Sequence, residues 1–212
     1  SVAKPEQVDA YEVGAKTQFL DRRVTLNMAG FYYSYKNQQF INISPVTAAQ
    51  TLANIPKSTI YGGEAELTAR ATDMLTLRAG LGLLSTKIKS GINVKGNRLS
   101  NAPKLTFSGG VDLKVMDNDA GKVTVTGDMS YQSSQYFEVI NVPRLKQKGY
   151  ALLSGNIGWE SADGRFNASV WGKNLAKKFY FTSRVDLLAG FGFDYNHIGA
   201  PRTYGVTVGV KY

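Results

Sequence analysis

Few residues in this sequence could carry chemistry. His197 is the one histidine among 212 residues, and cysteine is absent. Asp194 and Tyr195 are close to His197 in the chain, so metal ligation is conceivable, but a single histidine in a loop is more often simply exposed. A Ser-His-Asp arrangement needs a histidine held beside an ordered nucleophile, and nothing near His197 offers one. We therefore expect no catalytic residue, no metal site and no cofactor, and we expect that the protein is not an enzyme.

Two carboxylates are the next candidates. Glu64 and Glu66 are two residues apart in an alternating segment, so both side chains would point to the same face of a strand. Paired carboxylates can perform acid–base catalysis. Arg70 and Arg78 are expected on the same face. We therefore favour the alternative, a hydrated wall on which these arginines balance the two glutamates.

The composition narrows the class of protein. The formal net charge is +9, which is typical of nucleic-acid binding, but no recognition helix or basic stripe accompanies it. We expect no nucleic-acid partner. The mean hydropathy of -0.21 resembles that of a soluble protein, and no run approaches the roughly 20 apolar residues of a membrane helix. Membrane-spanning strands remain open, because alternation hides their apolar residues from an average.

The apolar residues recur with a period of two almost throughout, which predicts strands. In the first segment Tyr11, Val13 and Phe19 share one face, and Glu12 and Lys16 share the other. Helical periodicity is missing. The predicted strands span residues 8–20, 23–40, 61–70, 75–83, 105–114, 123–131, 151–159, 165–183 and 204–212.

The connections between these strands differ systematically. Short turns alternate with long segments, of which 41–57, 89–103 and 187–201 are examples. Short turns at one end and long loops at the other are typical of outer-membrane barrels, which are apolar outside and polar inside. A soluble β-sandwich is the alternative, in which the apolar face would meet a second sheet. The barrel interpretation places a charged set on the inner face, including Glu64, Glu66, Arg70, Arg78 and Asp112.

Two features of the aromatic residues test this alternation. Phe19, Trp159 and Phe166 lie near short turns, where an aromatic girdle at one membrane interface is expected. Trp171 does not fit, because strict alternation points it inward. Either it packs inside the wall, or a bulge shifts the register.

The chain ends on a further alternating strand, with one apolar face made of Tyr204, Val206, Val208, Val210 and Tyr212.

Four segments resemble TonB-dependent outer-membrane receptors. NAPKLTFSGGVDL (101–113) resembles a strand near the end of those barrels, and DGRFNASVWGKNLAKKFY (163–180) contains a similar WGKNL core. GAPRTYGVTVGVKY (199–212) resembles the final strand of the family, and PEQVDAYEVGAKTQFLDRRVTLNMAGFYYSYKNQQ (5–39) resembles an earlier pair of strands. The resemblance covers nearly the whole chain.

The resemblance implies an all-β fold, an antiparallel up-and-down transmembrane β-barrel of about 22 strands. About nine of them would be here, so residues 1–212 would be the C-terminal portion of the barrel, with the plug domain and the N-terminal strands absent. It also implies that the face from Tyr204 to Tyr212 is recognised by the barrel-assembly machinery, and that TonB acts through the absent plug. We expect the inward charges to hydrogen-bond that plug.

The long loops hold the remaining candidates. Tyr180, Phe191, Phe193 and Tyr195 could stack on a ligand, or pack among the loops. The basic loop residues could bind an anionic substrate, or meet phosphates of lipopolysaccharide on the cell surface, and we favour the second interpretation. These basic residues are Lys87, Lys89, Lys95, Arg98, Arg144, Lys146 and Lys148.

The function that this resemblance implies is TonB-dependent active uptake across the cell outer membrane of a scarce substrate, above all a ferric siderophore or similar iron chelate. Receptors for oligosaccharides or cobalamin share such walls, so the sequence leaves the substrate open. A passive porin or structural barrel is a further alternative, and a soluble β-rich binding module is another. The missing N-terminal sequence would separate the transporter from the passive barrel, because only the transporter needs a plug. Recovery from a lysate without detergent would support the soluble module.

Overall fold

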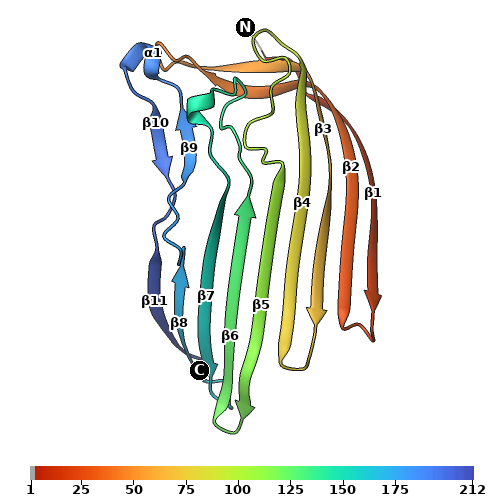
Figure 1. The fold of residues 1–212 in the computed structure, drawn as a ribbon, viewed down its shortest axis with the longest axis vertical. Coiled ribbons are helices and arrows are strands. Elements are labelled where there is room, and N and C mark those ends of the chain that lie inside the picture. The colour runs from red at the N-terminus through yellow and green to blue at the C-terminus, as the bar shows by residue number, and fades with distance from the viewer. Residues whose placement is uncertain (1–2) are drawn as a thin grey trace.

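The computed structural model describes residues 3–212 as a curved antiparallel wall of nine strands (Figure 1). Neighbours in the wall follow chain order up to β8, and the final strand, β11, pairs with β8. No helix in residues 3–212 is both long and apolar enough to cross a membrane. The strands of the wall are β1 (Gln7–Phe19), β2 (Val24–Ile43), β3 (Gln50–Arg70), β4 (Leu75–Ser90), β5 (Leu105–Asn118), β6 (Gly121–Gln132), β7 (Tyr150–Glu160), β8 (Phe166–Lys173) and β11 (Thr203–Val210).

The two ends of the wall differ as the sequence predicts. Short turns join the strands at the lower end in Figure 1, whereas the longer connections lie at the upper end. The β1–β2 turn is tight enough to need three consecutive residues with positive φ, Leu20, Asp21 and Arg22. We call the two ends the short-turn end and the long-loop end.

The prediction of a loop at residues 41–57 is wrong, because most of these residues form strands. β2 continues to Ile43 and β3 begins at Gln50. The pairing passes from Lys36↔Lys57 to Gln38↔Ile55, so Asn37 and Pro56 both stand out of the ladder. Asn37 has a φ of 53°, and a proline, which cannot donate to a ladder, is tolerated at such a break. β4 likewise runs on to Ser90, past the predicted end at residue 83.

The expected single strand at 165–183 is also wrong. β8 ends at Lys173, and the chain resumes as β9 (Phe181–Val185), which pairs with β10 (Tyr195–Ile198) in a separate two-stranded sheet. The buried side chain of Asn174 causes the break: its amide donates to the carbonyls of Lys178 and Ala200, and its oxygen accepts from the Lys178 N–H. The predicted loop at 187–201 therefore contains a strand and a one-turn helix, α1 (Leu188–Phe191).

We call residues 181–198 the arm, because they extend β8 and β11 beyond the crossing of their two connections (Figure 1). The arm meets the opposite side of the wall at the long-loop end. There β2 and β3 bend over the top, and the Gly190 N–H donates to the Pro45 carbonyl at 2.9 Å. The arm and the β2–β3 connection thus meet across the open long-loop end of the curved wall, which we call the mouth.

The register gives every strand two distinct faces. Tyr11, Tyr32 and Tyr61 lie side by side on β1, β2 and β3, and the same face carries the apolar alternating residues of the other strands. This face has no covering layer: Val206 is 68% exposed and Val208 is 74% exposed. A sandwich would bury them beneath a second sheet. We call it the outer face, and the opposite one the inner face.

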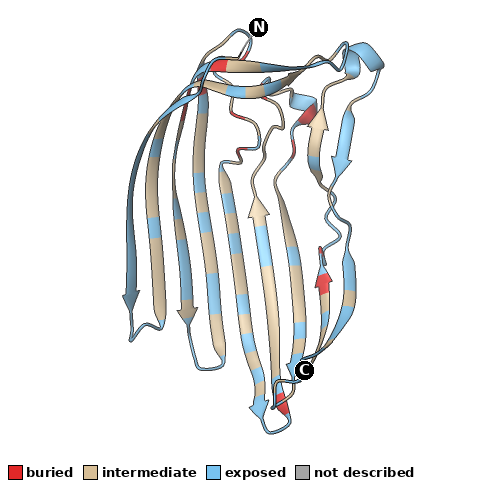
Figure 2. Ribbon diagram, turned by 180° about the vertical axis from the view of Figure 1, so that it is seen from behind, coloured by how far each residue is buried: buried red, intermediate tan, exposed pale blue. Residues whose placement is uncertain are grey.

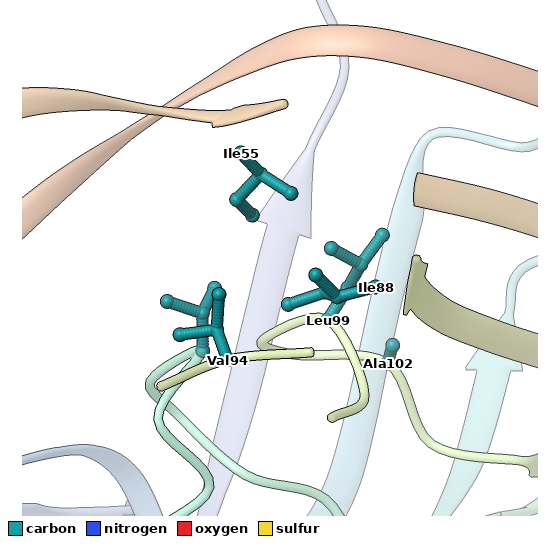
Figure 3. Packing of buried hydrophobic residues seen from close by; sticks show 6 residues of the cluster. Ile55, Ile88, Val94, Leu99 and Ala102 are labelled. Atoms are coloured by element: carbon teal, nitrogen blue, oxygen red, sulfur yellow. The ribbon is translucent and has the colours of Figure 1, made fainter. Parts of the chain in front are cut away.

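The buried apolar residues gather at the long-loop end rather than within the wall (Figure 2). Ile55 and Ile88, at the ends of β3 and β4, pack with Val94, Leu99 and Ala102 of the β4–β5 connection (Figure 3). Val139 of the β6–β7 connection completes the cluster. This cluster therefore packs the β4–β5 and β6–β7 connections against the ends of β3 and β4.

Candidate functional site

The inner face centres on Arg78 of β4. Its Nε donates to Asp112 Oδ2 at 2.9 Å, and its Nη2 donates to Asp128 Oδ1 at 3.1 Å. Thr126 Oγ1 also donates to Asp112, at 3.1 Å. Gly110 lies between these strands, and a Cβ there would be 2.8 Å from the guanidinium carbon. The missing side chain lets the guanidinium lie over Gly110 and reach both Asp112 of β5 and Asp128 of β6.

Glu64 and Glu66 share the inner face with Arg78, but no ion pair joins either of them to a cation within residues 3–212. The expected balance by Arg78 is wrong, since its partners are Asp112 and Asp128. Arg70 lies on the same face opposite Thr76, and it too has no carboxylate partner in the described chain. Gly82 and Gly80 stand opposite the two glutamates, so nothing on β4 shields them.

A hollow of about 590 Å³ lies against this face, and we call it the wall groove. Its floor is made of small residues on β4, β5, β6 and β7, namely Gly80, Ser108, Gly110, Ser130 and Ser154. The chain beyond β8 closes one side of it through Tyr180 and Pro201. The ring of Tyr180 stacks on Tyr150 of the wall, with ring centroids 4.5 Å apart. Small residues keep this floor open, and Glu66, Arg78 and Asp128 bring charge to a lining that is otherwise largely apolar.

Trp171 points to the inner face, as strict alternation predicts. The pairing of β8 with β11 is unbroken from Val210↔Phe166 to Thr203↔Lys173, so no bulge shifts the register. The Trp171 Nε1 donates to Thr207 Oγ1 at 3.1 Å, and its ring covers Gly205, where a Cβ would be 2.6 Å from the ring. The inner face thus accommodates one large ring by pairing it with a glycine.

The candidate loop aromatics do not behave as one set. Phe191 and Phe193, at the tip of the arm, lie with ring centroids 6.1 Å apart, and both are about half exposed. Tyr180 belongs to the wall groove instead. Tyr195 opens β10 opposite Val185 and is 52% exposed. Stacking on a ligand stays a prediction for each of them.

Two of the basic residues expected at the surface serve the loops themselves. Arg98 donates to the backbone carbonyls of Ala102 and Ser134. Arg144, in the short helix η1 (Pro143–Leu145), pairs with both Asp186 and Asp194 at the two ends of the α1 segment. Sequence reasoning missed these acidic partners, because they lie more than 40 residues away and follow no local pattern.

Glu138 is a further loop carboxyl that sequence reasoning missed. Burial raises the pKa of Glu138, and the nearby Asp186 carboxylate acts in the same direction. The Asp186 N–H, which donates to Glu138 Oε1 at 3.4 Å, lowers that pKa without cancelling the effect of burial. This carboxyl is therefore part of the contact between the β6–β7 connection and the arm.

His197 lies in β10 opposite Ser183, and its carbonyl accepts a hydrogen bond from Thr182 Oγ1. Within residues 3–212, no group of three or more histidine, cysteine or acidic side chains is arranged to hold a metal ion.

The final strand presents its apolar residues on the outer face. Val206, Val208 and Val210 stand opposite Val170, Ala168 and Phe166 of β8. Tyr204 is 77% exposed at one end of this row, and Tyr212 follows just beyond β11 at the other.

Comparison of the sequence with known proteins identifies a matching family. The family model described as TonB dependent receptor-like, beta-barrel matches residues 3–175. Among curated relatives, a probable TonB-dependent siderophore receptor of Acinetobacter baumannii is 28% identical over 193 residues, which are 84% of this chain and 24% of the relative. The ferripyoverdine receptor of Pseudomonas aeruginosa is 26% identical and matches 85% of this chain and 23% of its own length. The chain therefore spans about a quarter of these relatives.

Solved structures agree on the fold. The ferric yersiniabactin uptake receptor of Yersinia pestis superposes with a TM-score of 0.83 at 24% identity, covering 98% of this chain and 30% of that one. A siderophore receptor of Acinetobacter baumannii superposes with a TM-score of 0.77 at 23% identity, covering 98% and 29%.

Proposed function

The chain belongs to the TonB-dependent receptor β-barrel family, and we propose that it forms the C-terminal part of an outer-membrane receptor for active uptake of a ferric siderophore or similar iron chelate. The proposal places residues 1–212 in the barrel, with a plug domain and the N-terminal strands supplied by the rest of the protein. Its curated relatives support the substrate class, since one is named as a probable siderophore receptor and another as a ferripyoverdine receptor.

One observation carries this proposal: the wall has an uncovered apolar face and an opposite face rich in charge. Val208 is 74% exposed on the outer face, while Arg78, Asp112 and Asp128 form a connected network on the inner one. Such a wall needs hydrocarbon on one side and polar groups on the other. A barrel in the outer membrane with a protein plug inside supplies both.

The proposed partners follow from the same orientation. Outer-membrane lipid contacts the outer face, and lipopolysaccharide phosphates meet lysines near the long-loop end, such as Lys87, Lys89 and Lys95. TonB acts through the plug. The barrel-assembly machinery reads the final strand, through the face that carries Tyr204, Val206, Val208, Val210 and Tyr212.

The experiment that tests the function is uptake of radiolabelled iron by cells of the source organism in which the gene is deleted. We expect growth under iron limitation and uptake of one ferric chelate to fail, to return with the full-length gene, and to require an intact TonB. Uptake that is restored without TonB would indicate a passive barrel instead. Normal uptake of every chelate, with loss of growth on a sugar or on cobalamin sources, would move the substrate to those classes.

Glu64 and Glu66 supply a test of the plug. We propose that these two carboxylates, which have no cation partner in the described wall, bind basic groups of the plug. We expect the double variant, Glu64→Gln with Glu66→Gln, to loosen the plug. In planar bilayers, the open time of single channels of the full-length receptor should then rise several-fold. Glu160→Gln, on the inner face near the short-turn end, is the matched control. Equal leakage in the double variant and the control would refute the role.

A further inference from the structure

A second cavity, of about 420 Å³, lies between η1 and the connection that leads from β8 to β9. This volume is within the range of about 300–1,000 Å³ that ligand pockets occupy. We call it the basic pocket, because its lining contains no carboxylate. Its cationic residues are Arg144, Lys146, Lys148, Lys178 and Arg184.

The charge in this basic pocket is largely uncompensated. Arg144 is paired with Asp186 and Asp194, but the other four cations have no carboxylate within ion-pair distance in residues 3–212. Arg144, Lys146 and Lys148 are exposed, whereas Leu145 and Gln147 between them are buried, so all three cations stand on the exposed side of this segment. Crowding like charges is unfavourable unless an anion joins them.

Arg184 is held in place by uncharged partners. Its Nε donates to Asn196 Oδ1 at 2.6 Å and its Nη1 donates to the Arg144 carbonyl at 2.9 Å. Its guanidinium also lies 4.4 Å from the centroid of the Phe181 ring. A guanidinium fixed by neutral partners keeps its full charge for a ligand.

Aromatic rings accompany the cations in the same cavity. Phe179 is 65% exposed, and its ring meets Phe181 edge to face at 5.1 Å. Tyr180 lines both this pocket and the wall groove, so the two cavities meet at its side chain. A flat group can therefore stack on exposed ring surface while its oxygens meet the lysines.

We propose that the basic pocket binds a ferric chelate with several negative charges on aromatic oxygens, as in phenolates or catecholates, in preference to an uncharged chelate. The inference rests on the proposed function and names the substrate class that the pocket selects. Lipid phosphate offers similar anionic oxygens. We commit to the soluble chelate because Tyr180 joins the pocket to the wall groove, on the face opposite to the lipid-facing valines.

The test compares two probes on the full-length receptor in detergent, by quenching of tryptophan fluorescence. One probe is a ferric tris-catecholate, which is a trianion, and the other is a ferric trihydroxamate without net charge. The variant carries Lys146→Gln, Lys148→Gln and Lys178→Gln together. Because the variant removes three exposed charges, each worth up to about fivefold in affinity, we expect the Kd for the trianion to rise about ten- to hundred-fold. The Kd for the uncharged probe should change less than about twofold.

The matched control removes two lysines near the short-turn end, with Lys122→Gln and Lys211→Gln, and should leave both affinities unchanged. Phe179→Leu should weaken the trianion too, because it removes exposed ring surface without altering charge. Retained heat-modifiable mobility on gels shows that each variant is a folded barrel. An unchanged Kd for the trianion in the triple-lysine variant, or an equal loss for both probes, would overturn the proposal.

Two further outcomes separate the possible failures. A wild-type receptor that binds only the uncharged chelate overturns the inference and leaves iron uptake standing, whereas one that binds neither probe contradicts both. A separate measurement tests the lipid source: the amount of lipopolysaccharide retained by each purified protein. Loss of retained lipopolysaccharide in the triple-lysine variant, with the trianion affinity intact, would assign the pocket to lipid and overturn the proposal.

Discussion

At the scale of single residues, the inner face is organised around places where a side chain is missing. Gly110 makes room for the Arg78 guanidinium, and Gly205 makes room for the Trp171 ring. Alternation alone predicts the inward direction of Trp171, but not its partner. The glycine that accommodates it belongs to a strand 34 positions later in the chain, and only the register brings the two together.

The Trp171–Gly205 pair gives a direct test of this packing. Gly205→Ala places a Cβ 2.6 Å from the ring, so we expect the ring to move and the folded barrel to lose about 1–3 kcal/mol. Urea titration of the full-length receptor, followed by tryptophan fluorescence, measures the loss. Thr207→Val removes only the hydrogen bond to Nε1 and should cost about 1 kcal/mol or less. A larger effect of Thr207→Val would mean that the hydrogen bond, not the space, matters.

Glu138 predicts a pH dependence at the contact of the β6–β7 connection with the arm. Because burial raises the pKa of Glu138 in the folded state, its contribution to stability is fully present below the unfolded value and is lost as pH rises through the folded pKa. Arg144, Asp186 and Asp194 are the charged groups that face it. We expect protection of this contact from hydrogen exchange to decline as pH rises above 4.5, the ordinary value.

The Glu138→Gln variant is the control for that dependence, since it keeps the shape and removes the titration. The ratio of exchange rates between variant and wild type cancels the intrinsic effect of pH. A ratio that stays constant from acid to neutral pH would show that Glu138 does not titrate in this range.

At the scale of elements, the sequence predicts the strands that alternate cleanly, including both faces and the short turns. The prediction fails where a side chain forms hydrogen bonds with the backbone of a distant segment and so ends a strand. Asn174 ends β8 by holding Lys178 and Ala200, and nothing before residue 174 indicates that. β2 and β3 run past their predicted ends because Asn37 and Pro56 fall at the same break in the ladder.

The same limit applies to the candidate site. The inward positions follow from period two, whereas the partners do not. Arg78 pairs with Asp112 and Asp128 instead of the glutamates of β3, because Gly110 opens the path across β5 to Asp128. Loop residues carry no periodicity, so the pairing of Arg144 with Asp186 and Asp194 could not be read from the sequence.

The final strand provides a prediction at this scale. A lysine on the lipid side of a barrel costs about 2–4 kcal/mol at the bilayer midplane and less toward the interfaces. We therefore expect Val208→Lys to lower the amount of folded receptor in outer membranes, and Val208→Ile to leave it near the wild-type amount. Heat-modifiable mobility of the membrane fraction measures both. Equal yields from the two variants would show that Val208 does not face hydrocarbon.

At the scale of the whole molecule, the nine strands form a wall with two free edges, on β1 and on β11 (Figure 1). Unpaired edges are unfavourable in lipid, where backbone groups have no water to bond. In the proposed receptor the remaining strands close the wall between these edges, and the arm with the bent ends of β2 and β3 stands over the mouth. In that proposal, the formal charge of +9 suits a surface that meets the anionic lipid of the outer membrane.

The measurement that tests this account most directly uses the absence of cysteine in residues 1–212. Single cysteines replace Met129, Leu153 and Val206 on the outer face and Ser130 and Ser154 on the inner face, and each carries a nitroxide in the full-length receptor in lipid bilayers. We predict that oxygen, which dissolves in hydrocarbon, collides preferentially with labels on the outer face. A water-soluble nickel complex should collide preferentially with labels on the inner face. Equal accessibility of the two faces to both reagents would contradict it.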